Sequence, residues 1–193
     1  MANRWLIVGL GNPGPEYMNT RHNIGALVVE RMAAQSQAKF SAHKARADIA
    51  EIRLGVGGET PVLILARPRS YMNESGGPVK GLADYFSIAP DQIIVLHDEL
   101  DIEFNSIRVK LGGGDNGHNG LKSVTQSMGN GEYYRIRMGI GRPQGQQDPA
   151  DFVLKQFASQ EKKDLEVFLA EGGDAIESLI TQGLEKTQQD FNS

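Results

Sequence analysis

Short apolar runs recur along this chain, and polar loops rich in glycine, asparagine or histidine follow them. Three of these runs have the length of a buried strand: Trp5–Val8, Pro61–Ala66 and Gln92–Leu96. Stretches with helical periodicity lie between them, so predicted strands and helices alternate through most of the chain. This alternation predicts an α/β fold, in which a sheet carries helices on both faces.

The remaining elements favour a mixed sheet in a single domain. Alternating side chains predict strands at 48–54, 106–111 and 134–140. Helical periodicity predicts one helix capped by Asn23 and further helices at 79–86, 121–127, 151–157 and 160–181. We expect the last of these helices to be broken at Gly172-Gly173. The strand pairs 48–54/61–66 and 98–111/134–140 lack full helical crossovers. We therefore expect one domain over residues 1–193, with a twisted, mixed, mostly parallel sheet and an acidic helical part at 160–193.

The composition excludes several classes of protein. The chain has no cysteine, which rules out disulfides, thiolate catalysis and cysteine-based zinc sites. The N-terminus lacks a signal-peptide pattern and no apolar run approaches the roughly 20 residues that span a bilayer, so we expect a cytoplasmic protein without membrane association. The acidic surplus behind the net charge of −4 lies in residues 151–193, so a basic cluster elsewhere can still bind nucleic acid.

Gly9, Gly11 and Gly14 have the spacing of the dinucleotide-binding fingerprint. That fold needs a helix that begins within the glycine loop, and an acidic residue about 20 residues further on at the end of a second strand. Here the helical pattern begins only near Asn23, and Glu30 falls inside it. The sequence therefore favours a tight turn that exposes an asparagine, and it predicts no nicotinamide or flavin cofactor.

Candidate catalytic groups lie in loops that follow predicted strands, where α/β sheets form their sites. His22 in TRHN is either a general base or a helix-cap or surface histidine. Asp98 follows the apolar run IIVLH, where a carboxylate either orients an imidazole, as in a catalytic triad, or caps a turn. The neighbouring His97 points elsewhere in an extended chain, so we expect it to be a packing or surface residue.

Three asparagines lie in loops rich in glycine or proline: Asn12, Asn73 and Asn119. An amide offers donors and an acceptor without charge, so three amides around a pocket could bind a carbonyl, a water and sugar hydroxyls. Alternatively each is a turn residue, the usual role of asparagine beside glycine. His118 precedes Asn119, but no spacing such as H-x-x-x-H links the histidines, and we predict no metal ion.

Basic side chains flank the second glycine loop, GGGDNGHNG, in the sequence: Lys110, Lys122, Arg135, Arg137 and Arg142. Arg135 and Arg137 share a face because side chains along a strand alternate. The cluster could bind phosphates through charge-assisted hydrogen bonds, or it is ordinary solvated charge. The chain has neither a G-x-S-x-G elbow nor a P-loop, so the hydrolytic chemistry that remains is a water activated by histidine.

Six motifs, in order along the chain, resemble the bacterial peptidyl-tRNA hydrolases: GLGNPGPEYMNTRHNIG, RPRSYMNESG, HDELD, KLGGGDNGHNGLKS, RIRMGIGRP and DPADFVL. The resemblance runs from Leu6 to Phe157. It implies a single α/β domain, usually monomeric, that acts without a metal ion or cofactor. It also implies cleavage of the ester between a peptide and the 3′-terminal ribose of tRNA, which recycles tRNA from aborted translation.

The resemblance assigns a catalytic role to three positions. His22 of TRHN matches the catalytic base, and Asp98 of HDELD matches its orienting partner. Asn12 of GNPG matches the group that positions water or the scissile carbonyl. The expected mechanism is attack by a water that neutral His22 deprotonates, with no covalent enzyme intermediate, while Asn12 or a backbone N–H stabilises the oxyanion.

Substrate contacts are implied in the same way. Asn73 of YMN and Asn119 of GHNG match residues that hold the 3′ end and the peptide backbone. Tyr17 and Met72 match residues that line the same cleft.

The positions implied to bind tRNA phosphates are Lys110 and Arg137. The family commonly has GGGHGGHNG where this chain has GGGDNGHNG, so Asp115 replaces a histidine and Asn116 replaces a glycine. Asparagine tolerates a left-handed backbone, so we expect the loop to keep its shape. Asp115 adds a negative charge near the expected phosphate face.

Two other classes of function stay open at this point. One is a related α/β hydrolase or protease that acts on a protein, which would cleave without a tRNA moiety. The other is a non-catalytic tRNA-binding protein, which would be indifferent to His22. The acidic part from Gln160 is either a lid over the cleft or a packing layer, and we favour packing.

Overall fold

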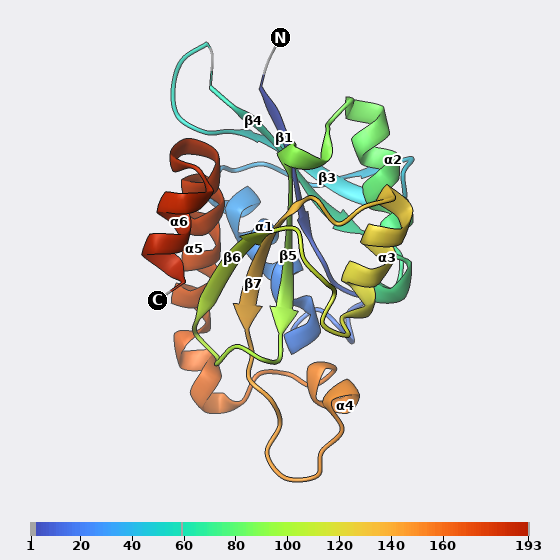
Figure 1. Cartoon of the computed structure of the whole chain (residues 1–193), viewed down its shortest axis with the longest axis vertical. Coiled ribbons are helices and arrows are strands. Elements are labelled where there is room, and N and C mark those ends of the chain that lie inside the picture. Colours follow the sequence, from blue (N-terminus) through green and yellow to red (C-terminus); the bar gives the residue numbers. More distant parts are fainter. Residues whose placement is uncertain (1–2, 59, 193) are drawn as a thin grey trace.

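A seven-stranded mixed sheet lies at the centre of the computed structural model, which describes residues 3–58 and 60–192 (Figure 1). The strand order is β2-β3-β4-β1-β5-β7-β6. The strands are β1 (Arg4–Gly9), β2 (Ser41–His43), β3 (Ala47–Arg53), β4 (Val62–Pro68), β5 (Ile93–Glu99), β6 (Ile107–Leu111) and β7 (Tyr134–Gly139). The central strands β4, β1, β5 and β7 pair in parallel, and β2, β3 and β6 join through antiparallel pairings. The predicted mixed sheet is confirmed, with parallel pairing confined to its centre.

Helices cover both faces of this sheet, as the alternation of elements predicts (Figure 1). They are α1 (Ile24–Gln35), α2 (Gly76–Phe86), α3 (Asn119–Met128), α4 (Pro149–Val153), α5 (Ser159–Gln182) and α6 (Leu184–Phe191). One face packs against α1 and α5 in a cluster that includes Ile7, Val28 and Phe168. The other packs against α2 and α3 in a cluster that includes Leu6 and Leu82. Leu6 and Ile7 enter different clusters because successive side chains of a strand point to opposite faces.

Close packing between β1, α1 and β5 accounts for two glycines. A Cβ atom on Gly9 would collide with the carbonyl of Gly25, and a Cβ atom on Gly25 would collide with the carbonyl of Leu96. After β1 the chain runs through a long loop and a 3₁₀ turn, η1 (Arg21–Asn23), before α1 begins at Ile24, as predicted. The first glycine of the fingerprint therefore serves contact between strand and helix, and a phosphate-binding helix does not begin at this loop.

The long helix α5 differs from its prediction, because it continues through Gly172-Gly173 without a break. A Cβ atom on Gly172 would lie 3.0 Å from Cγ2 of Val28 and 3.1 Å from Cε of Met138, so glycine lets α5 approach α1 and β7. Packing at this position thus explains a residue that sequence rules treat as a helix breaker. In addition α4 is shorter than the predicted 151–157, and β2 and α6 were not predicted.

The carboxyl ends of the parallel strands lie at one edge of the sheet, where the loops with candidate catalytic side chains begin (Figure 1). The loop after β1 carries Asn12, the loop after β4 carries Asn73, and β5 ends with Asp98 and Glu99. The N-terminus of α3 brings Asn119 to the same edge, and α4 lies beside it. Within the described part of the chain, none of the helices is long and apolar enough to cross a membrane.

Candidate active site

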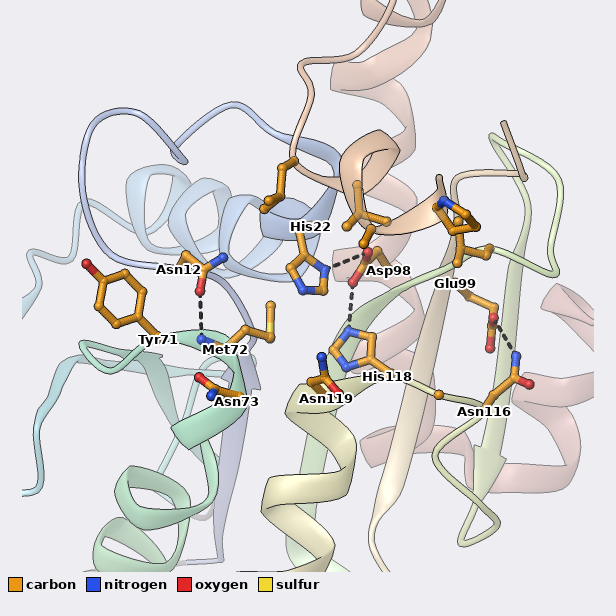
Figure 2. Close-up of a pocket in the computed structure, with 16 residues that line it drawn as sticks. Asn12, His22, Tyr71, Met72, Asn73, Asp98, Glu99, Asn116, His118 and Asn119 are labelled. Atoms are coloured by element: carbon orange, nitrogen blue, oxygen red, sulfur yellow. Dashed lines mark hydrogen bonds and ion pairs between the residues drawn. The ribbon is translucent and has the colours of Figure 1, made fainter. Parts of the chain in front are cut away.

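A cavity of about 500 Å³ opens at the carboxyl edge of the sheet (Figure 2). Its polar lining consists of Asn12, His22, Asn73, Asp98, Glu99, Asn116, His118 and Asn119. Its apolar lining consists of Tyr71, Met72, Leu100, Pro149, Ala150, Val153 and Leu154. An apolar wall facing a few convergent polar groups is typical of a substrate site.

The imidazole of His22 and the carboxylate of Asp98 meet inside this cavity. Nδ1 of His22, in η1, lies 2.8 Å from Oδ2 of Asp98, near the end of β5 (Figure 2). The Asp98 side chain is only 3% exposed. Because a carboxylate can only accept here, Nδ1 of His22 carries the proton and Nε2 is left as the basic ring nitrogen. The structure thus brings together the two residues that the sequence analysis expected as base and orienting partner.

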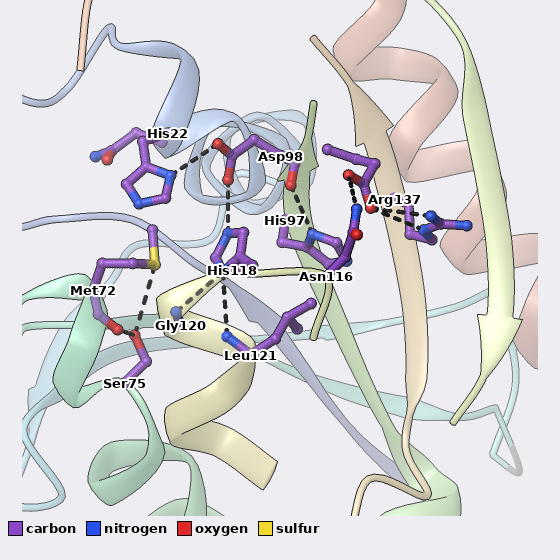
Figure 3. A network of polar contacts seen from close by, with 12 residues as sticks. His22, Met72, Ser75, His97, Asp98, Asn116, His118, Gly120, Leu121 and Arg137 are labelled. Carbon is purple, nitrogen blue, oxygen red and sulfur yellow. Dashed lines mark hydrogen bonds and ion pairs between the residues drawn. The ribbon is translucent and has the colours of Figure 1, made fainter. Parts of the chain in front are cut away.

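His118 holds the other oxygen of the same carboxylate. Its Nε2 lies 2.8 Å from Oδ1 of Asp98, and its Nδ1 accepts hydrogen bonds from the backbone N–H groups of Gly120 and Leu121 at 3.0 and 3.2 Å (Figure 3). The imidazole is therefore the N-cap of α3, in the neutral tautomer with hydrogen on Nε2. The sequence analysis considered His118 only as a metal ligand. Its position immediately before a predicted helix was the available signal for a capping role.

His22 and Asp98 shift each other's pKa in opposite directions. Burial acts against the charged form of His22, but the charge and hydrogen bond of Asp98 outweigh it and raise the pKa of His22 above its ordinary 6.5. Burial also acts against the charged form of Asp98, but the electrostatic effect and the hydrogen bonds of the His22 and His118 imidazoles hold its pKa far below its usual value. Asp98 is therefore a permanent carboxylate, and His22 is a stronger base than a free imidazole.

His97 is a buried packing residue, one of the two roles expected for it. Its Nδ1 bonds to the backbone carbonyl of Asp98 at 2.8 Å, and its ring packs edge-on against His118 with centroids 5.1 Å apart. Burial first, and then the proximity of His118, lower its pKa well below 6.5, so it stays neutral. It contributes no charge to the site.

Asn12 presents its amide hydrogens to the cavity. Its Oδ1 accepts a hydrogen bond from the backbone N–H of Met72 at 2.6 Å, which fixes the orientation of the amide (Figure 2). The side chain of Asn23 makes two hydrogen bonds to the backbone of Asn12. Its Oδ1 accepts from the N–H of Asn12 at 2.8 Å, and its Nδ2 donates to the carbonyl oxygen of Asn12 at 2.9 Å. Asn23 occupies the N-cap position of α1, as predicted, but its side chain makes no capping bond there. Its amide instead supports the cavity wall, a role that the sequence analysis missed.

The other expected substrate residues fall into two groups. Met72, Asn73 and Asn119 line the cavity. Tyr17 was expected to line it too, but it is not among the lining residues and instead contacts Tyr71, with the two rings edge to face and centroids 6.4 Å apart. The aromatic residue at the mouth is therefore Tyr71, which is 55% exposed. Resemblance did not single it out, although it directly precedes Met72.

The structure separates the five basic residues around the glycine loop, and Lys122 is exposed on α3. Arg135 is fully buried, and its guanidinium donates to the carbonyls of Gly113, Gly114 and Gly131. The expectation that it could bind phosphate is therefore wrong, because its hydrogen bonds instead stabilise the loop. Arg142 is exposed and paired with Asp101 at 2.6 Å.

Lys110 and Arg137, the two positions implied by resemblance, form a cationic pair on β6 and β7. Arg137 contacts Glu99 at 3.0 Å and is 20% exposed. Burial and the nearby charges of Arg137 and Arg135 lower the pKa of Lys110. Lys110 lies opposite Arg135 in the pairing of β6 with β7, and Arg137 lies two residues further along β7, so Lys110 and Arg137 belong to the same face of the sheet.

His22, Asp98 and His118 are the described residues with the composition and spacing to hold a metal ion, since one ligand atom from each lies within 4.8 Å of the others. In the present arrangement Nδ1 of His22 and Nε2 of His118 are both engaged with Asp98. A metal ion would have to replace both protons. The absence of a metal thus stays a prediction, to be tested with a chelator.

An α/β sheet whose carboxyl edge holds an imidazole, a buried carboxylate and oriented amide donors has the features of a hydrolase that activates water. A family model described as peptidyl-tRNA hydrolase matches residues 6–193. The chain belongs to the peptidyl-tRNA hydrolase family.

Individual members of the family are similar to this chain over almost its full length. The peptidyl-tRNA hydrolase of Kineococcus radiotolerans is 52% identical over 196 residues and is covered to 99%, with all of this chain aligned. That of Streptomyces coelicolor is 50% identical over 191 residues, which cover 98% of this chain and 95% of the relative. A crystal structure of the Acinetobacter baumannii peptidyl-tRNA hydrolase superposes with a TM-score of 0.84 at 33% identity, covering 98% of this chain and 94% of that one.

Proposed function

We propose that this chain hydrolyses the ester between a peptide, or an N-blocked amino acid, and the 3′-terminal ribose of tRNA, with a water activated by His22. Membership of the family supports the substrate. The observation that carries the mechanism is the 2.8 Å contact between Nδ1 of His22 and Oδ2 of Asp98, which leaves Nε2 free to accept a proton. We expect no metal ion or cofactor to take part.

The reaction begins when Nε2 of neutral His22 takes a proton from water. The oxygen of that water attacks the ester carbonyl, and Asp98 stabilises the imidazolium that forms. Because Oδ1 of Asn12 accepts a hydrogen bond from the N–H of Met72, the amide is held with its hydrogens toward the cavity, and they donate to the developing oxyanion. The imidazolium then returns the proton to the ribose oxygen, which leaves as a hydroxyl.

The polar, apolar and basic residues in and around the cavity each bind a different part of the substrate. Asn73 and Asn119 bind the 3′ end and the peptide backbone, and the apolar wall with Met72 receives peptide side chains. Lys110 and Arg137 bind a phosphate of the tRNA. Since one chain supplies all of these groups, we propose that it acts as a monomer, as a single domain over residues 1–193, in the cytoplasm, where it recycles tRNA from aborted translation.

The decisive experiment is cleavage of an N-blocked aminoacyl-tRNA by wild type and by His22→Ala, with EDTA present. We expect wild-type cleavage to survive EDTA and kcat to fall by about 10²- to 10⁴-fold in His22→Ala, the usual worth of a general base. His43→Ala, which removes an imidazole from β2 outside the cavity, is the matched control and is expected to behave as wild type.

Two further measurements on the wild type, of tRNA binding and of cleavage of a blocked peptide without tRNA, separate the alternatives. A wild type that binds tRNA without cleaving it would be a tRNA-binding protein, and one that cleaves blocked peptides without the tRNA moiety would be a protease. Equal cleavage by wild type and His22→Ala would refute His22 as the base.

A further inference from the structure

The loop between β6 and α3 forms one wall of the cavity and contains four glycines: Gly112, Gly113, Gly114 and Gly117. Glycines give a chain large conformational freedom, so such a loop needs specific contacts to hold one shape. Asn116, a non-glycine residue within it, adopts the left-handed conformation with φ of 49°, as its residue type permits. Its side chain lines the cavity rim.

The amide of Asn116 joins this loop to the end of β5. Its Nδ2 donates to Oε2 of Glu99 at 2.9 Å (Figure 2). The same Nδ2 donates to Oδ2 of Asp101 at 2.7 Å. Both hydrogens of a single amide therefore point at carboxylates that a different segment provides. Hydrogen bonds to ionised acceptors are stronger than those between neutral groups.

Glu99 connects this contact to the cationic pair. It is 5% exposed, and its other oxygen, Oε1, accepts from Nη2 and Nε of Arg137 at 3.0 and 3.3 Å. Asn116 and Arg137 therefore bond to different oxygens of one carboxylate. Arg142 balances the charge of Asp101 at 2.6 Å, so the second acceptor is fixed as well.

We infer that Asn116 is a positioning residue that latches the glycine loop to Glu99 and Asp101 and so holds Arg137 in the orientation that binds tRNA. The inference rests on the proposed function, since it takes Arg137 as a phosphate ligand. The latch acts on substrate affinity rather than on chemistry. His118, two residues along the loop, has its own anchors in Asp98 and the N–H groups of α3, so the His22–Asp98 pair keeps its geometry when the latch is removed.

Two substitutions remove the latch while preserving the backbone. Asn116→Gly accepts the positive φ and deletes both hydrogen bonds. Asn116→Asp also accepts it, but places a third carboxylate against Glu99 and Asp101. The matched control is Asn105→Gly, because Asn105 is exposed, has a φ of 72° and lies outside the cavity.

The test is kcat and KM for an N-blocked aminoacyl-tRNA, measured for each variant alone and in an Arg137→Ala background. For Asn116→Gly we expect KM to rise by about three- to tenfold, in line with the loss of hydrogen bonds to charged acceptors, with kcat within about twofold of wild type. Asn116→Asp should raise KM further, and Asn105→Gly should leave it unchanged. In the Arg137→Ala background Asn116→Gly should add little, because the group it orients is gone.

An unchanged KM in Asn116→Gly would overturn the inference. It would also be overturned if the KM of the double variant rose by the product of the two single effects, because Asn116 and Arg137 would then act independently. A fall in melting temperature with no change in KM, which is what a purely structural loop contact predicts, would overturn it as well. If the wild type does not cleave at all, the proposed function fails instead. The dissociation constant for tRNA, measured by filter binding on the same variants, then tests the role of Asn116. A rise in this constant in Asn116→Gly that is absent when the substitution is made in the Arg137→Ala background supports the inference. An unchanged dissociation constant in Asn116→Gly overturns it.

Discussion

Nε2 of His118 lies 2.8 Å from Oδ1 of Asp98, while the opposite nitrogen of the same ring caps helix α3. The helix N-terminus thereby fixes the tautomer of His118, and His118 fixes the carboxylate. Oδ2 of Asp98 is left to face His22. The carboxylate that orients the proposed base is therefore itself held in place by a second imidazole, that of His118. This arrangement gives His118 a role that can be tested apart from its capping bond.

Replacing His118 with asparagine should lower kcat by about tenfold while KM stays near wild type. Asparagine is a good N-cap, so α3 keeps its start, but its shorter side chain does not reach Asp98. The carboxylate then loses one hydrogen bond to a charged acceptor, which is worth about 1.5–3 kcal/mol. Single-turnover and steady-state kinetics, with circular dichroism to check the fold, measure this. A kcat equal to wild type would show that His22 alone orients Asp98.

The pH dependence of kcat/KM should have an acid limb with its midpoint above 6.5. His22 must be neutral to accept a proton, and its pKa in the folded protein is raised, so activity is lost as pH falls through that raised pKa. Asp98→Asn removes the raising charge while the burial remains, so its residual activity should show an acid limb shifted to below 6.5. A midpoint that does not move in Asp98→Asn would contradict the coupling of these two residues.

Lys110→Ala and Arg137→Ala should each raise KM for the tRNA substrate and leave kcat within a fewfold of wild type. Each should also reduce the slope of log KM against log salt by about one, the effect of one lost phosphate contact. Lys186→Ala is the control, because Lys186 is exposed and pairs with Asp190 within α6. An unchanged salt slope in both variants would rule out a phosphate contact by Lys110 and Arg137.

Two neighbouring glycines of α5 should respond oppositely to alanine. Gly172→Ala places a Cβ atom 3.0 Å from Cγ2 of the fully buried Val28, and this overpacking costs about 1–3 kcal/mol, more than the roughly 1 kcal/mol gained in helix propensity. Gly173→Ala meets only Met32, at 3.5 Å, so the propensity gain should remain. Denaturant unfolding should find the first variant less stable than wild type and the second equally or more stable. The reverse order would mean that α5 does not pack on α1 as described.

Much of the fold was accessible from local patterns. Buried strands such as β1 and β4 have apolar runs of the right length, and α1 begins where periodicity and Asn23 predict it. The break predicted at Gly172 was wrong because propensity rules ignore the contact with Val28 that favours glycine there. Strand β2 has three residues, too few for a periodic signal, and its pairing with β3 defines it.

For the site, local sequence patterns were enough to predict which chemical groups gather at one edge of the sheet, because parallel strands bring the loops after their carboxyl ends together. That rule accounts for Asn12, His22, Asn73 and Asp98, whereas Asn119 follows the antiparallel strand β6 and reaches the same edge through the N-terminus of α3. The partners of these groups could not be predicted in this way: His118 bonds to Asp98, Asn116 bonds to Glu99, and Arg135 is buried against the glycine loop. These contacts depend on distances of a few ångströms between segments that are far apart in the sequence, and the spacing of residues along the chain does not encode such distances.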